Sequence, residues 1–109
     1  MKEKNEVVEK SFAFAVRIVK LSQFLQKEKK EYVLSKQLLR SGTSVGANVN
    51  EAQAAQSKKD FIAKLSISSK EARESKYWID LLIASDYLDA SADHVHSLLE
   101  ENIALVKLL

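Results

Sequence analysis

The chain has 109 residues, 46% of them hydrophobic and 29% charged, with a net charge of +2. This length fits one domain over residues 1–109, and the absence of cysteine excludes disulfides and thiolate metal sites. With no proline and only two glycines, nothing outside short loops forces the backbone out of a helix. The longest apolar runs fall far below the roughly 18 residues of a membrane span, and the charged segment Met1–Lys10 does not resemble a secretory signal. We therefore expect a cytoplasmic, all-α protein that does not enter a membrane.

The first predicted helix, about residues 5–27, carries two apolar stripes. One stripe repeats in alternating steps of four and three residues, which keeps its side chains on one helix face. Its members are Val7, Ser11, Phe14, Ile18, Leu21 and Leu25. A second stripe, displaced by roughly 100° on the helix, consists of Val8, Phe12, Val16 and Val19. Because a helix in a monomeric bundle needs only one buried face, the second stripe predicts contact with another subunit.

The charged stretch Lys27–Glu31 predicts a frayed helix end and a connection to a second helix over about residues 32–56. The core stripe of this helix is Leu34, Leu38, Gly42, Val45, Val49 and Ala52. An alternative interpretation breaks the chain at Ser41–Ser44 and makes two short helices. The continuous helix is favoured because the apolar phase is preserved across Gly42 and Gly46. Their small size would let a neighbouring helix approach closely.

Ser57 and Asp60 resemble a capping box and predict the start of a third helix, over about residues 58–85. Its core seam is Phe61, Leu65, Ser68, Ala72, Ser75, Ile79 and Leu82 or Ile83. A flank of Ile67, Trp78 and Leu81 is a second candidate contact surface. Glu71 and Glu74 lie between these residues. For the two glutamates, the favoured interpretation is an ion-paired face with Lys70, Arg73 and Lys76.

The last predicted helix covers about residues 91–108. Its buried face is Val95, Leu98, Leu99, Val106 and Leu109, with Asn102 inside the stripe. Four amphipathic helices joined by short links predict an antiparallel, up-down-up-down four-helix bundle.

One side of the second predicted helix is lined by small polar groups next to the apolar stripe. These residues are Gln37, Arg40, Ser41, Ser44, Asn48 and Glu51. Small hydroxyls and amides suit a crowded surface where hydrogen bonds must be satisfied. Two interpretations stay open: a pore or interface lining with Arg40 presented to a ligand anion, or a structural hydrogen-bond network between helices.

The basic residues are unevenly distributed along the chain. Residues 1–56 carry 10 Lys and Arg against 6 Asp and Glu, whereas residues 57–109 carry 7 against 9. A basic half can attract phosphate backbones, and it can equally be a solvated surface. The candidates for nucleic-acid contact are Lys36, Arg40, Lys58 and Lys59. Because the last two lie near the opposite end of the second helix, the four do not form one dense patch.

No constellation of side chains predicts catalysis. His94 and His96 are two residues apart, so on a helix they point about 200° apart and cannot share a metal. The chain contains no Glu-x-x-His motif, Gly-rich phosphate loop, nucleophile elbow or zinc spacing. We expect neither an enzyme nor a bound cofactor.

Several motifs resemble those of a known family. Residues 35–52 read SKQLLRSGTSVGANVNEA, and residues 57–61 read SKKDF. Further along the chain come KLSI at 64–67, KEARE at 70–74 and YW at 77–78. Over about residues 7–88 the chain is similar to the four-helix-bundle proteins encoded in intervening sequences of bacterial 23S ribosomal RNA genes. The family often has glycine at position 52 and arginine near 55 or 56, where this chain has Ala52, Ala55 and Gln56.

The resemblance implies assembly and a nucleic-acid context. Such proteins are similar to the accessory subunit of diversity-generating retroelements, which binds nucleic acid and a reverse transcriptase, and relatives form ring-shaped homopentamers. The leading hypothesis is a non-catalytic pentameric bundle that binds RNA or DNA, or that scaffolds a nucleic-acid enzyme. The alternative is a protein–protein adaptor with no nucleic-acid role, whose stripes engage helices of a partner protein.

Overall fold

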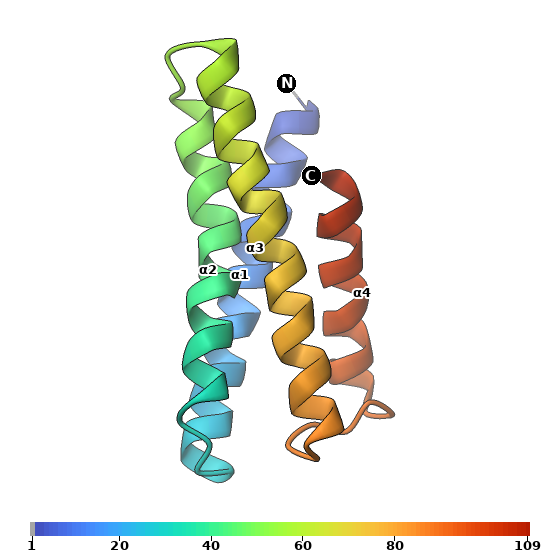
Figure 1. Ribbon diagram of the computed structural model, residues 1–109. Helices are drawn as coiled ribbons and strands as arrows, with labels where there is room; N and C mark the ends of the chain where they lie inside the picture. Colours follow the sequence, from blue (N-terminus) through green and yellow to red (C-terminus); the bar gives the residue numbers. More distant parts are fainter. Residues whose placement is uncertain (1) are drawn as a thin grey trace.

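Four antiparallel helices make up the computed structural model, which describes residues 2–109, with side chains from Glu6 onward. Met1, included in the predicted domain, lies outside the described residues. The helices are α1 (Lys2–Glu28), α2 (Leu34–Gln53), α3 (Lys58–Ala84) and α4 (Asp93–Leu108). Both α1 and α3 pack against α2 and α4, and successive helices run in opposite directions (Figure 1). The predicted all-α, up-down-up-down bundle is confirmed.

The core follows the phase of the predicted stripes, but Leu105 is buried although it was not predicted. Six predicted members from α1, α2 and α4 are only half-buried: Val7, Leu21, Leu34, Leu99, Val106 and Leu109. The buried apolar members of the core from α1 and α2 are Phe14, Ile18, Leu25, Leu38, Val45, Val49 and Ala52. Those from α3, the following turn and α4 are Ala72, Ile79, Leu82, Leu88, Val95, Leu98 and Leu105. Phe61 and Leu65, predicted for the core seam, are only half-buried. The reason is visible in Figure 1: α4 ends well short of the α2–α3 connection, so it does not cover the first turns of α3.

Serine hydroxyls take up an unusual share of the interior. The buried serines are Ser11, Ser22, Ser35, Ser41, Ser68 and Ser75. Several bond across helices: Ser68 donates to the Val45 carbonyl at 2.6 Å, and Ser75 donates to the Ser41 hydroxyl at 3.0 Å. Buried Asn102 on α4 likewise donates to the Ala72 carbonyl of α3 at 2.9 Å. Such pairing offsets the desolvation of these donors, whereas the buried Oδ1 of Asn102 has no hydrogen-bond partner among the described residues.

Helix α2 runs unbroken through both glycines, so the continuous helix is confirmed and the alternative break at Ser41–Ser44 is wrong. The glycines are needed because α1 lies very close. A Cβ atom on Gly42 would stand 2.8 Å from Cγ1 and Cγ2 of Ile18, and one on Gly46 would stand 3.1 Å from the Ser11 carbonyl oxygen.

Two turns are built without glycine. Lys30, after α1, and Asp86, after α3, adopt left-handed backbone conformations with φ of 57° and 70°. In the first turn, the Glu31 amide reaches back six positions to the Leu25 carbonyl at 3.0 Å. This bond ends α1 sharply where a frayed end was predicted. In the second turn, the Tyr87 amide donates to the Leu82 carbonyl at 2.9 Å and the Asp86 amide donates to the Ile83 carbonyl at 3.0 Å. This is the Schellman pattern, which usually employs glycine at the left-handed position.

Helix α2 begins later than predicted because Glu31 caps it from outside. The Glu31 carboxylate accepts hydrogen bonds from the backbone amides of Val33, Leu34 and Ser35 at 3.2, 2.9 and 2.7 Å. Burial acts to raise the pKa of Glu31, but these three donors outweigh it and leave the pKa below its usual value. The sequence pattern predicted that this residue lies in a connection, and it did not indicate the cap.

We expect Glu31→Gln to lower the free energy of unfolding by about 1–2 kcal/mol at pH 7, the usual value of a helix cap. Since the folded-state pKa is depressed, the carboxylate's contribution is complete above its unfolded pKa and disappears as the pH falls through the folded value. Urea unfolding from pH 7 to pH 3 checks this. The difference between wild type and variant should shrink on acidification, and a difference that stays constant over that range contradicts the assignment.

Candidate functional site

The second apolar stripe of α1 faces away from the protein's own core. We call Val8, Phe12, Val16 and Val19 the α1 stripe. The Phe12 side chain is 70% exposed, Val16 and Val19 are each 39% exposed, and Val8 is half-buried. Its members Val8 and Phe12 line a groove between α1 and α2, whose α2 side includes small residues such as Thr43, Gly46 and Ala47. This side of the bundle therefore has an apolar surface of small residues beside one exposed aromatic ring.

A second apolar surface lies on α3. We call Ile67, Trp78 and Leu81 the α3 flank; Ile67 is exposed and the other two are half-buried. The Trp78 indole N–H donates to Glu74 at 3.0 Å, which fixes the orientation of the ring. No direct packing of α1 on α3 occurs within the described chain, because the two helices lie diagonally across the bundle. The α1 stripe and the α3 flank are therefore two different surfaces.

Arg40 is held by two carboxylates of α3. Its guanidinium lies 3.3 Å from the Glu71 carboxylate and also bonds Glu74. The hydrogen bond from Trp78 holds the pKa of Glu74 below its usual value, and Arg40 acts in the same direction against the effect of burial. The predicted ion-paired face exists, but the direct partner of both glutamates comes from α2.

The neighbouring cations of α3 bond elsewhere. Arg73 donates to Ser69, and Lys76 pairs with Asp80 at 2.8 Å. Lys70 acts on Glu74 only through its charge, by lowering the pKa of that carboxyl group.

The polar side of α2 divides into two parts. Ser41 is buried and accepts the hydrogen bond from Ser75 of α3, and the Asn48 amide donates to the Ser44 carbonyl at 2.9 Å. The Ser75–Ser41 bond supports the structural hydrogen-bond network between helices, whereas the Asn48–Ser44 bond lies within α2. Gln37 and Glu51 are exposed and remain candidates for contact with a partner.

The four predicted nucleic-acid residues are not brought together. Lys36 is exposed in the first turn of α2, whereas Lys58 and Lys59 are exposed at the start of α3, beyond the other end of α2. The rise of an α-helix puts about 26 Å between the two groups. Arg40, between them, shares its charge with Glu71 and Glu74.

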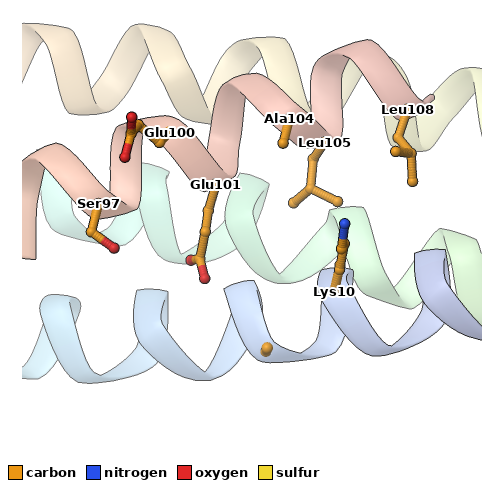
Figure 2. Close-up of a pocket in the computed structure, with 8 residues that line it drawn as sticks. Lys10, Ser97, Glu100, Glu101, Ala104, Leu105 and Leu108 are labelled. Atoms are coloured by element: carbon orange, nitrogen blue, oxygen red, sulfur yellow. The ribbon is translucent and has the colours of Figure 1, made fainter.

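A hollow of about 350 Å³ lies between α1 and α4. In Figure 2, Lys10 points from α1 into the gap, while Leu105 and Leu108 enter it from α4. Lys10 pairs with Glu6 at 2.8 Å, and Glu101 pairs with Arg17 at 3.0 Å, so these charges are balanced within the chain. The sequence did not predict this hollow, because its lining includes small residues on two helices that lie far apart in sequence.

The sequence predicted neither a metal site at the histidines nor a membrane-spanning helix. His94 and His96 are both exposed, and the described residues contain no group of three or more His, Cys, Asp or Glu that could hold a metal ion. Among the helices described, none has the length and apolar character needed to cross a bilayer.

The fold and these surfaces define a small four-helix-bundle protein with an exposed apolar stripe on α1 and a partly exposed apolar flank on α3. Residues 3–109 match the family model described as 23S rRNA-intervening sequence protein, and the chain belongs to that family. The resemblance drawn from the motifs of residues 35–78 is thereby confirmed.

A solved relative agrees with this assignment. The crystal structure of a protein with unknown function from the S23 ribosomal protein family of Bacteroides thetaiotaomicron VPI-5482 is 50% identical, with a TM-score of 0.92. The match covers 97% of this chain and 93% of that one. No curated protein matches the chain.

Proposed function

We propose that this protein forms a homopentameric ring in the cytoplasm and acts as a non-catalytic scaffold for nucleic acid or for an enzyme that works on it. The observation that carries the proposal is the exposed α1 stripe, above all Phe12 with 70% of its side chain exposed. A contiguous apolar patch of this kind, bordered by a groove of small residues, is typical of a protein–protein contact.

The position of the two apolar surfaces favours a ring over a simple dimer. A twofold dimer uses one self-complementary patch, whereas contacts between two different patches generate closed rings or open filaments. The α1 stripe and the α3 flank are different patches on diagonal helices. The number five comes from the resemblance to ring-forming relatives. Light scattering on the purified chain tests the ring, and a mass equal to one chain would remove it.

Assembly into a ring would also bring the separate lysines of different copies into a regular arrangement. Contacts between helix faces keep neighbouring bundles side by side, with their long axes roughly parallel. Lys36 of each copy then falls near one rim of the ring, and Lys58 and Lys59 fall near the other. Repetition turns isolated cations into two basic circles that can follow a phosphate backbone.

We expect Lys36→Glu to weaken RNA binding and to flatten its salt dependence. For single-stranded RNA, each phosphate that the protein no longer neutralises reduces the steepness of log K against log salt by about 0.7. Fluorescence anisotropy of a labelled RNA across a salt series measures both effects. Lys107→Glu, an exposed lysine of α4, is the matched control and should bind like wild type. Identical curves for Lys36→Glu and wild type contradict the nucleic-acid role.

The alternative function, a protein adaptor without nucleic acid, is favoured by the Arg40 contacts. Because Glu71 and Glu74 neutralise this arginine, the α2–α3 face carries less positive charge than the sequence suggested. Affinity purification distinguishes the two functions: an adaptor should bring down one stoichiometric partner protein and no RNA. RNA that co-purifies with wild type but not with Lys36→Glu supports the scaffold.

A further inference from the structure

A second hollow between α1 and α4 has a different chemical character from the one in Figure 2. It has a volume of about 340 Å³ and lies further along α1, beyond Arg17. Its apolar lining consists of Leu21, Phe24, Val95 and Leu98, and its remaining lining residues are Arg17, Lys20 and His94. We call it the basic-rimmed hollow. Phe24 is 42% exposed, so an apolar wall stands open to solvent here.

The rim combines one fixed cation with one free cation. The Arg17 guanidinium donates to the Ser97 hydroxyl at 3.0 Å and to the His94 carbonyl at 2.8 Å, and it also pairs with Glu101. These bonds hold it in place against α4. Lys20 is exposed and forms no ion pair with any described side chain, so its ammonium group is available to a ligand.

The start of α4 adds to the positive potential at this end of the hollow. The N-terminus of a helix carries partial positive charge. The residue before α4 is Ala92, whose side chain forms no cap, and Asp93 in the first turn offsets part of the charge.

Neighbouring hollows do not share this charge pattern. The one in Figure 2 is lined by the carboxylates of Glu100 and Glu101, and the one between α3 and α4 includes Asp80. Within the part of the chain that the structure describes, no carboxylate lines the basic-rimmed hollow. An apolar wall edged by Arg17 and by the unpaired Lys20 is complementary to a molecule that is apolar over most of its surface and carries one negative charge.

We propose that the basic-rimmed hollow binds a small amphiphilic anion, an apolar chain or ring bearing one carboxylate. The apolar part packs on Leu21, Phe24 and Leu98, and the carboxylate meets the Lys20 ammonium beside Arg17. The site does not depend on ring formation. The α1 stripe borders the groove with α2, whereas this hollow lies on the α4 side of α1.

The test is calorimetric titration of the full chain with decanoate, kept below its micelle-forming concentration, and with decanol as the uncharged match. We expect one saturable decanoate site and weaker binding of decanol. Lys20→Gln should weaken decanoate about fivefold, as expected for an exposed charge contact, and leave decanol unchanged. Phe24→Ala should weaken both ligands.

Lys27→Gln is the matched control, because Lys27 is an exposed lysine of α1 that does not line the hollow. It should bind decanoate like wild type. Absence of saturable decanoate binding overturns the proposal. An equal effect in Lys20→Gln and Lys27→Gln also overturns it, because such a result reports only general attraction of an anion to a basic helix.

Discussion

Phe12→Glu will convert the assembled protein into single chains while its helix content stays that of wild type. Phe12 lies outside the protein's own core and is 70% exposed in the isolated chain. In an assembly the same ring would be desolvated at the contact. A glutamate there would bury an unpaired charge, which costs several kcal/mol. Light scattering gives the mass, and far-ultraviolet circular dichroism gives the helix content.

Two further substitutions sharpen the experiment. Val19→Glu changes another member of the α1 stripe, which is 39% exposed, and should also dissociate the assembly. Ile103→Glu changes a residue of matched exposure, 38%, on α4, outside the α1 stripe and the α3 flank. It should leave the mass unchanged. If all three variants keep the wild-type mass, the α1 stripe is not the contact between copies.

Gly42→Ala will destabilise the bundle although alanine is the better helix former. Alanine gains about 1 kcal/mol of helix propensity over glycine. The new Cβ would lie 2.8 Å from two γ carbons of Ile18, which is stiff at χ1 because it is β-branched. Overpacking of this kind typically costs about 1–3 kcal/mol. We expect a net decrease of up to about 2 kcal/mol in the free energy of unfolding, measured by urea denaturation.

A double-mutant cycle separates this clash from any general effect of the substitution. Ile18→Ala removes the atoms that Gly42→Ala would strike, so the glycine substitution should cost much less in that background. Gly46→Ala is a milder substitution for comparison, because its Cβ would stand 3.1 Å from the Ser11 carbonyl oxygen. It should lower the free energy of unfolding by less than Gly42→Ala does. Equal cost of Gly42→Ala in both backgrounds would show that Ile18 is not what requires the glycine.

Most of the fold could be predicted because it depends on periodicity and local caps. The phase of the apolar residues across Gly42 and Gly46 indicated one helix, and α2 is continuous. Ser57 was expected to cap the third helix, and its hydroxyl accepts the Asp60 amide at 3.0 Å. Periodicity also separated Phe12 from the core, since a displacement around the helix axis can be read directly from sequence spacing.

Other features could not be predicted, because they depend on distances between helices. The sequence places Arg40 and Glu71 on different elements, and only the packing of α2 on α3 makes them partners. The hollow of Figure 2 includes small residues of two helices, such as Ala13 of α1 and Ala104 of α4, which only the packing brings together. Glu31 was missed for a local reason: it caps α2 from beyond the usual capping position, so the ordinary start signal was absent.

The buried serines of the core affect how the stability of the fold depends on protein concentration. Six buried positions hold a hydroxyl where a larger apolar group would remove more carbon surface from water. The isolated subunit thus has a smaller hydrophobic contribution to its stability than its length permits. If copies associate through α1, mass action adds the missing stabilisation. Dilution alone would then lower the melting temperature of the protein. Subunits that are synthesised faster than they associate would be the ones exposed to proteases.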